Sequence, residues 1–186
     1  YDVYQWPQEM YDGSTETFEM LRRADTVKAI AILTPEEQKK LKNVQDLSAD
    51  EAGNKIVITR QMQPRKDWFY DYPGGRMDET DANELEAAKR EMREEAGLEF
   101  ENWKLVEVHQ PFTKIDWLVY TFVANGLVGQ TKQELDAGEK IEVKLATLEK
   151  IEQLAKTDES QYLRFRDFDK IRNGAKLEDM AELYQY

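Results

Sequence analysis

One short stretch of the chain is rich in glutamate: Glu84, Glu91, Glu94 and Glu95. In a helix each residue turns the chain by about 100°, so Glu91 and Glu95 stack one turn apart and Glu94 flanks them. Like charges at this spacing destabilise a helix by about 0.2–0.5 kcal/mol per pair, and burial adds a loss of hydration. A bound divalent cation reverses both effects, and carboxylate oxygens on a rigid backbone suit Mg²⁺ or Mn²⁺.

The same charge pattern also fits an ordinary surface helix with a solvated acidic face. Glu86 and Arg90 are four residues apart and would form a conventional supporting ion pair in such a helix. On charge alone the solvated face is the simpler interpretation. The neighbouring residues must therefore decide between the two.

The helix that carries the glutamates has a predicted start and stop. Asp81 suits the N-cap position, Glu84 completes a capping-box pattern, and Gly97 suits the left-handed position after the last turn. Between these ends runs an apolar stripe at helical spacing, which should face a core. Its members are Leu85, Ala88, Met92 and Ala96.

The order of residues in this helix resembles a known motif. Residues 90–98, REMREEAGL, match the REUxEExGU half of the Nudix box, in which U is a bulky aliphatic residue, and Gly74-Gly75 precede it. The chain is therefore similar to the Nudix hydrolases. The resemblance implies a loop–helix–loop whose glutamates bind divalent ions and hydrolyse a nucleoside diphosphate linked to another group. It assigns the metal to Glu91, Glu94, Glu95 and the backbone carbonyl of Gly74.

The first half of the motif departs from the family pattern. The family places a glycine, five residues, a glutamate and seven residues before the arginine, and counting back from Arg90 reaches Ala82 and Arg76. One extra residue in the loop would place Gly75 and Asp81 at these two positions. We expect the insertion to lengthen the loop and to leave the helix unchanged. The capping role explains Asp81 equally well.

Other segments resemble the Nudix enzymes that hydrolyse ADP-ribose. Phe18-Glu19 followed by Arg23 is similar to a motif of their N-terminal sheet, which joins the two subunits of a dimer. The resemblance implies that Phe18 stacks on the adenine, that Trp6 is the second aromatic wall, and that Arg23 reaches a phosphate. Alternatively, Phe18 and Trp6 fill a hydrophobic seam between the arm and the core.

Two further features concern the substrate. Asp71 lies two residues before Pro73, where this subfamily has a glutamate. Gln63 lies where the subfamily has an arginine, so Arg65 or Arg60 is expected to take over its contact with the phosphates. This departure leaves room for another substrate.

A polar loop from 129 to 138 ends in a further match. Residues 138–143, GEKIEV, fit the pattern Gly-Glu-x-hydrophobic-Glu-Val of a mobile loop that carries the proposed catalytic base of ADP-ribose pyrophosphatases. The resemblance makes Glu139 the predicted base and Glu142 the second choice, although either could be a plain loop-tip charge. Glu94 and Arg90 complete the predicted catalytic set, with Arg90 holding the glutamates in place.

Composition limits the other classes of function. The 186 residues carry a formal net charge of −12, which argues against nucleic acid as a partner, because phosphate backbones need clustered lysine and arginine. No apolar run approaches the roughly 20 residues of a membrane span, and the N-terminal residues lack the basic-then-apolar pattern of a signal segment. The sequence has no cysteine, which is compatible with a reducing, cytoplasmic location.

The surrounding segments should position these residues. Residues 1–24 read as a β-hairpin arm around Asp12-Gly13. Strands are predicted at 26–33, 55–60, 103–109 and 116–124, and helices at 35–43, 147–155, 162–171 and 177–184.

Together these features predict one α/β domain over residues 1–186, a Nudix α/β/α sandwich around a mixed β-sheet. It would comprise an arm at 1–24 that forms a homodimer, a core at 25–158 and a helical tail at 159–186. The expected activity is Mg²⁺-dependent, or Mn²⁺-dependent, hydrolysis of a nucleoside diphosphate sugar, ADP-ribose to AMP and ribose 5-phosphate in first place. The alternatives are another nucleotide sugar or a dinucleotide, a sensor that binds without cleaving, and a scaffold protein.

Overall fold

A mixed β-sheet forms the centre of the molecule in this computed structural model, which describes residues 1–157 and 163. Its strands run in the order β4-β11-β5-β3-β10-β8, with β6 paired to β5 and β7 paired to β3. Their bounds are β3 (Thr26–Leu33), β4 (Gln45–Asp46), β5 (Lys55–Gln63), β6 (Lys66–Asp71), β7 (Gly74–Arg76), β8 (Leu98–His109), β10 (Val119–Gln130) and β11 (Lys140–Ala146). β10 lies parallel to β3 and antiparallel to β8, which confirms the predicted mixed sheet.

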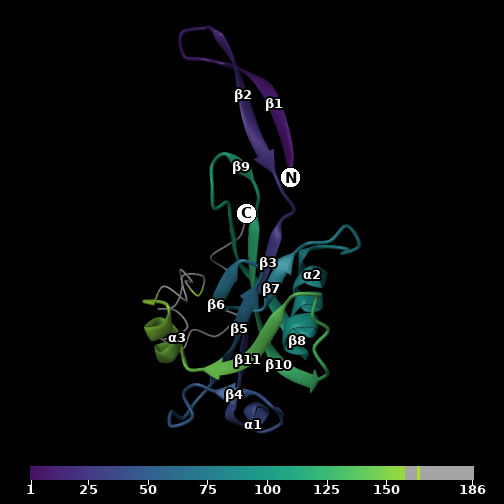
Figure 1. The fold of residues 1–186 in the computed structure, drawn as a ribbon, viewed down its shortest axis with the longest axis vertical. Coiled ribbons are helices and arrows are strands. Elements are labelled where there is room, and N and C mark those ends of the chain that lie inside the picture. The colour runs from purple at the N-terminus through teal and green to yellow at the C-terminus, as the bar shows by residue number, and fades with distance from the viewer. Residues whose placement is uncertain (158–162, 164–186) are drawn as a thin grey trace.

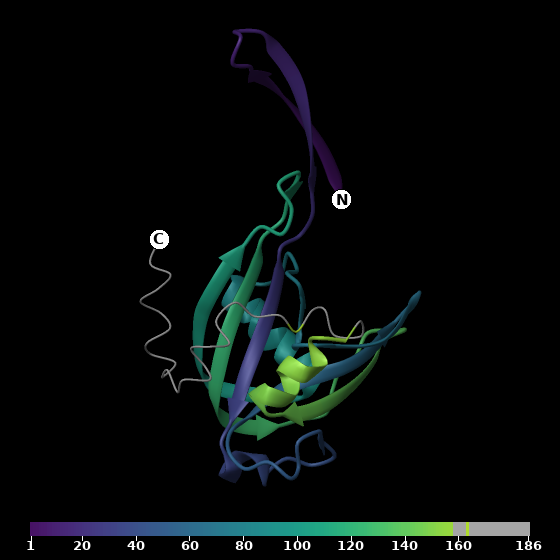
Figure 2. The same ribbon diagram turned by 90° about the vertical axis from the view of Figure 1, so that its left-hand side faces the viewer.

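Helices lie on both faces of this sheet (Figures 1 and 2). One face carries α2 (Glu84–Glu91) and the π-helical turn η1 (Met92–Ala96), and the other carries α3 (Leu148–Leu154). A short helix α1 (Pro35–Gln38) lies below the sheet in Figure 1. The predicted α/β/α layering is therefore confirmed.

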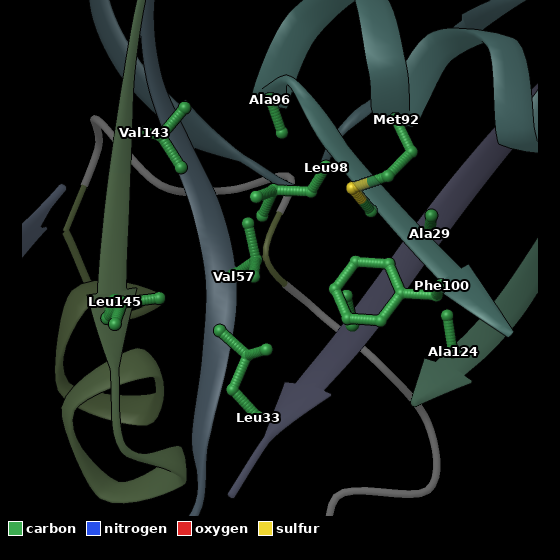
Figure 3. Packing of buried hydrophobic residues seen from close by; sticks show 11 residues of the cluster. Ala29, Leu33, Val57, Met92, Ala96, Leu98, Phe100, Ala124, Val143 and Leu145 are labelled. Carbon is green, nitrogen blue, oxygen red and sulfur yellow. The ribbon is translucent and has the colours of Figure 1, made fainter. Parts of the chain in front are cut away.

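The glutamate helix is anchored by the apolar stripe that the sequence indicated. Met92 and Ala96 are fully or almost fully buried and belong to a cluster with Val57 and Phe100 from the sheet. Figure 3 shows Met92 and Ala96 pointing from the helix toward these strands. Since burying a methionine side chain stabilises the fold by about 1.5–3 kcal/mol, this stripe fixes the rotation of the helix about its axis.

The N-terminal hairpin differs from the core. Strands β1 (Asp2–Glu9) and β2 (Thr15–Arg22) pair antiparallel, as predicted, and extend away from the sheet in both views (Figures 1 and 2). The hairpin contains no buried residue. It joins the rest of the chain through the two-residue strand β9 (Ile115–Asp116), which runs parallel to β2.

Several predicted boundaries are wrong. The helix expected at 35–43 ends at Gln38, and the strand expected at 55–60 continues to Gln63. The strand expected at 103–109 begins at Leu98, directly after the helix. Inside a sheet the backbone continues to pair as long as a neighbouring strand is present, so the strands outlast their apolar runs.

The end of the chain is described only in part. Leu163 is buried, and its carbonyl accepts a hydrogen bond from the Tyr72 hydroxyl (3.2 Å). The helices predicted at 162–171 and 177–184 otherwise lie outside the described residues. The division at residues 24 and 158 stays a prediction.

Candidate active site

A cavity of about 640 Å³ lies beside the glutamate helix. It gathers seven of the predicted site residues in one lining: Arg23, Gly74, Arg90, Glu91, Glu94, Glu95 and Glu139. The rest of the lining comes from Thr26, Gln63, Pro64, Gly75, Arg76, Asp78, Glu134, Leu135, Asp136 and Ala137. The strand end, the helix and the polar loop of the sequence prediction therefore meet at one place.

The glutamates of the helix have unequal surroundings. Glu91 and Glu95 are 9 % and 6 % exposed, whereas Glu94 is more accessible. Burial raises the pKa of Glu91 to about 7, against the lowering effect of Arg90. Burial also raises the pKa of Glu95 well above its usual value, although its Oε2 accepts a hydrogen bond from the Gly74 N–H (2.8 Å). The contacts of Glu91 and Glu95 with Arg90 and Gly74 thus do not fully offset the cost of burying these two neighbouring negative charges.

Arg90 holds two of these carboxylates with one nitrogen. Its Nη1 lies 2.9 Å from Glu91 Oε1 and 2.9 Å from Glu94 Oε2. Its Nε and Nη2 bind the two oxygens of Asp81 at 3.0 and 2.9 Å. This arrangement raises the pKa of Arg90 and, through the hydrogen bond, lowers the pKa of Asp81. Arg90 is therefore a fixed cation that orients the glutamates.

Asp81 does not cap the helix, so that prediction is wrong. Asn83 is the N-cap, and its Oδ1 accepts a hydrogen bond from the Glu86 N–H (3.0 Å). The expected Glu86–Arg90 pair is also wrong, because Glu86 binds Lys89 (2.8 Å). Asp81 instead closes the lengthened loop onto Arg90, where a charge-assisted contact is stronger than a cap.

The two glycines allow the backbone to approach the carboxylates. A Cβ at Gly75 would lie 2.5 Å from Oε1 of Glu91, and a Cβ at Gly74 would lie 2.2 Å from the carbonyl oxygen of Val27. The contact at Gly74 is with backbone, so only glycine lets β7 run this close to β3. The contact at Gly75 is with the end of the Glu91 side chain, so a larger residue there would force that carboxylate to move.

The helix ends in a π-helical turn that the sequence did not reveal. Residues Met92–Ala96 form η1, and Gly97 closes it with φ 66°, as the left-handed prediction required. Glu94 and Glu95 both lie in this turn. Such turns within α-helices are frequent at functional sites, and they change the rotation of the residues that follow.

These residues fit a hard divalent cation in their chemistry. Among the described residues no three carboxylates or imidazoles converge into a ready-made metal cage, since Glu91 and Glu94 turn to Arg90 and Glu95 binds Gly74. All the side-chain donors nevertheless are carboxylate oxygens, which Mg²⁺ and Mn²⁺ prefer. The raised pKa of Glu91 and of Glu95 shows that added positive charge would be favoured here.

The polar loop is tied to the end of the helix. The Glu134 N–H donates to the Glu94 carbonyl (2.9 Å), and the Thr131 N–H donates to the Gly97 carbonyl (2.7 Å). Half-buried Glu139 follows and lines the cavity opposite the helix. Glu142 lies outside the lining and pairs with Lys144 (2.8 Å) and Arg60 (3.6 Å). Only the first-choice residue for the base therefore faces the glutamates.

The predicted substrate residues divide into two groups. Arg23 lines the cavity, whereas Arg60, Arg65 and Asp71 do not. Arg60 lies over the Trp68 ring (4.6 Å), and Arg65 occupies the exposed turn between β5 and β6 with φ 69°. Asp71 is held by Lys28 at 2.6 Å, and burial raises its pKa. Gln63 itself lines the cavity, and the expected contact of Arg60 or Arg65 with the phosphates stays a prediction.

The aromatic residues of the arm also lie away from the cavity. Trp6 and Phe18 are paired across β1 and β2, with ring centroids 5.8 Å apart. Glu19 accepts a hydrogen bond from Gln5 on the same hairpin (2.5 Å). Within one chain these side chains neither reach the glutamates nor fill a seam against the core.

Sequence reasoning missed several lining residues. Arg76, directly after Gly75, is the most notable of them. Like Arg23, it lines the cavity and forms no ion pair within residues 1–157. Counting back from Arg90 by the family spacing arrives at Arg76, but that position was expected to be a glycine, so Arg76 was not considered as a site residue. Asp78, Glu134 and Asp136 had no recognisable signal, since they enter the cavity only through the path of their loops.

Comparison with known proteins establishes the family. The model of the NUDIX domain family matches residues 47–168, so the chain belongs to the Nudix family, as predicted. A solved structure described as an ADP compounds hydrolase is similar in fold, with 16 % identity, 97 % of this chain and 84 % of that chain covered, and a TM-score of 0.57. A Nudix hydrolase from Nitrosomonas europaea is similar with 15 % identity, 88 % and 96 % covered, and a TM-score of 0.54. No curated protein matches the chain.

One class of element is absent from the described residues. No helix within them has the length and apolar character needed to cross a membrane.

Proposed function

We propose that the chain hydrolyses the pyrophosphate bond of a nucleoside diphosphate sugar, with ADP-ribose giving AMP and ribose 5-phosphate as the first choice. The observation that carries the proposal is the shared cavity of Glu91, Glu94, Glu95, Gly74 and Glu139. A protein that only binds its ligand has no need for two buried carboxylates, Glu91 and Glu95, without full charge compensation and with the Glu139 carboxylate in the same cavity. The expected cytoplasmic location stays a prediction.

The proposed cation is Mg²⁺, with Mn²⁺ as the alternative, and Nudix hydrolases generally use divalent metals. Glu91, Glu94, Glu95 and the Gly74 carbonyl would hold it. Such an ion, when bound, neutralises phosphate charge and makes water a better nucleophile. Arg90 keeps Glu91 and Glu94 oriented through its bond to Asp81.

Glu139 is proposed to orient the attacking water and to accept its proton. Its position on a loop fixed to the helix end by backbone hydrogen bonds supports this role. Arg23 is proposed to bind a phosphate, since it is the cation of the arm that lines the cavity. The proposed roles of Trp6, Phe18 and Glu19 require a second copy of the chain.

The arm supports a proposed homodimer. An isolated two-stranded hairpin is marginally stable in water, yet this one exposes Val3, Phe18 and Leu21 beside a hollow of about 600 Å³. A second copy that covers this surface would bury the apolar side chains. It would also bring the Trp6–Phe18 pair to another molecule's cavity, where an adenine could stack on it.

The test is incubation with ADP-ribose, with and without Mg²⁺, followed by identification of the products. We expect AMP and ribose 5-phosphate in equal amounts, and only with the metal. Cleavage of a different nucleotide sugar or of a dinucleotide, with ADP-ribose intact, would support the alternative substrates. That alternative is favoured by Gln63 in the lining in place of an arginine.

A non-catalytic sensor is the second candidate function. The altered first half of the motif and the Asp81–Arg90 closure of its loop favour it. Such a protein would be stabilised by ADP-ribose in a melting experiment, yet the nucleotide would remain intact after prolonged incubation with Mg²⁺. No feature of the cavity supports the third alternative, a scaffold protein.

A further inference from the structure

Arg23 has surroundings that differ from those of Arg90 in the same cavity. Seven carboxylate residues line this cavity: Asp78, Glu91, Glu94, Glu95, Glu134, Asp136 and Glu139. Within residues 1–157 Arg23 nevertheless forms no ion pair, and its Nε is buried without a hydrogen-bond partner. A buried donor left unpaired is unfavourable, so another contact must hold the side chain in this position.

Aromatic rings hold the Arg23 side chain. Its guanidinium carbon lies 4.2 Å from the centroid of the Trp117 ring and 5.8 Å from the centroid of the Tyr1 ring. Trp117 is itself fixed, because its Nε1 donates to Thr26 Oγ1 (2.9 Å) and its ring stacks on Phe112 with centroids 6.2 Å apart. The backbone N–H of Arg23 also donates to the Asp116 carbonyl (3.2 Å).

A stacked guanidinium is well suited to bind phosphate. Stacking on an indole uses the face of the guanidinium and leaves its N–H edge free for bidentate bonds to an anion. It also restricts a flexible side chain before the ligand arrives, which lowers the entropy lost on binding. An arginine paired with a carboxylate is also restricted, but it uses its N–H edge on that partner.

We propose that Trp117 is a positioning residue that aims Arg23 into the cavity, where Arg23 binds the diphosphate of the substrate. The inference rests on the proposed function, and it adds a residue outside the Nudix motif. A matched pair elsewhere shows the difference: Arg60 lies 4.6 Å over Trp68, outside the cavity, and pairs with Glu142.

The experiment compares Trp117→Leu, Trp117→Phe and Arg23→Ala with wild type, and uses Trp68→Leu as the control. Steady-state hydrolysis of ADP-ribose with Mg²⁺ gives kcat and KM, and calorimetry with ADP-ribose and Ca²⁺ gives Kd. We expect Arg23→Ala to raise KM and Kd by about fifty-fold and Trp117→Leu by about five-fold, with kcat within two-fold of wild type. Trp117→Phe, which keeps an aromatic face, should restore most of the loss, and Trp68→Leu should have no effect.

A double-variant cycle separates positioning from plain packing. If Trp117 acts through Arg23, adding Trp117→Leu to Arg23→Ala changes KM by less than about two-fold, whereas independent effects would multiply. Multiplying effects, or a wild-type KM in Trp117→Leu, would overturn the inference. If Trp117→Leu does not fold, the same cycle is run with Trp117→Met, which also lacks an aromatic face.

The outcomes also separate this inference from the proposed function. Hydrolysis by wild type with an unchanged KM in a folded Trp117 variant that lacks an aromatic ring overturns the inference alone. Binding of ADP-ribose that weakens in those variants, without any hydrolysis by wild type, overturns the proposed function alone. Neither binding nor hydrolysis by wild type overturns both.

Discussion

The glutamate helix and the N-terminal hairpin are opposites in how their functional side chains are placed. Met92 and Ala96 lock the helix to the sheet, and Arg90 and Gly74 fix the carboxylates that it carries. The hairpin has no buried residue and directs its aromatic pair away from the cavity. The comparison teaches that one folded chain can position the proposed catalytic groups by itself, whereas its proposed base-stacking groups need another molecule.

The strongest test of the helix is Glu95→Gln. We expect kcat to fall by orders of magnitude, because a neutral amide is a poor ligand for a divalent cation. The melting temperature should stay the same or rise, since a buried charge beside Glu91 is removed while the Gly74 N–H keeps an acceptor. Enzyme assay and calorimetric melting measure the two effects.

Glu86→Gln is the control for this variant, because Glu86 is exposed on the same helix and its side chain binds only Lys89 among the described residues. Unchanged turnover in Glu95→Gln would remove the metal-ligand assignment. A parallel loss in Glu86→Gln would mean that any change of charge on the helix matters.

The next largest effect is expected for Gly75→Ala. Its Cβ would lie 2.5 Å from Glu91 Oε1 and would displace that carboxylate. A misplacement of about 1 Å lowers activity by about a hundred-fold, so we predict a loss of this size in kcat. Gly129→Ala is the matched control, because its Cβ would meet nothing within 4 Å. Equal activity of the two variants would contradict the close approach at β7.

The hairpin is tested by Phe18→Ala. If a second copy supplies the stacking surface, KM should rise by about ten-fold, because a stacked base contributes about 1–3 kcal/mol. The melting temperature should barely change, since Phe18 contributes nothing to the core. Tyr11→Ala, at the fully exposed turn of the same hairpin, controls for general loss of the arm surface. A KM equal to wild type in Phe18→Ala would separate the arm from substrate binding.

The smallest effect is expected at the helix start. Asn83→Ala should lower the free energy of unfolding by about 1 kcal/mol, the usual contribution of an N-cap, and leave kcat unchanged. Asp81→Asn should lower kcat more than stability, because it loosens Arg90 and the carboxylates beyond it. Denaturant unfolding together with the enzyme assay distinguishes the two residues. Reversed results would restore Asp81 as the cap.

Much of the fold was predictable because the signals are local. The strand at Thr26–Leu33 is a run of β-branched and apolar residues between polar ends, and its bounds were predicted correctly. The stripe at Ala88, Met92 and Ala96 and the left-handed Gly97 follow from helical periodicity and the conformational freedom of glycine. The motif itself fixed which glutamates share the helix.

The rest depends on contacts between distant segments. Asp81 and Asn83 are equally good caps by type, and only the reach of Arg90 across the loop decides between them. Whether Arg60 or Arg23 faces the cavity depends on the direction in which each strand presents its side chains, which sequence spacing does not specify without the register. The π-helical turn has no sequence signature that distinguishes it from α-helix.

The short parallel pairing of β2 with β9 has a consequence for how assembly and recognition are linked. Arg22 lies opposite Asp116 in this pairing, Arg23 follows Arg22 directly, and Trp117 follows the end of β9 directly. The chain leaves the hairpin and enters the cavity within a single residue, so any rotation of the hairpin also turns the guanidinium that faces the glutamates. If a second copy of the chain binds the hairpin as proposed, assembly would adjust the affinity of the cavity at the hairpin's base, and dilution of the protein would first appear as a higher KM.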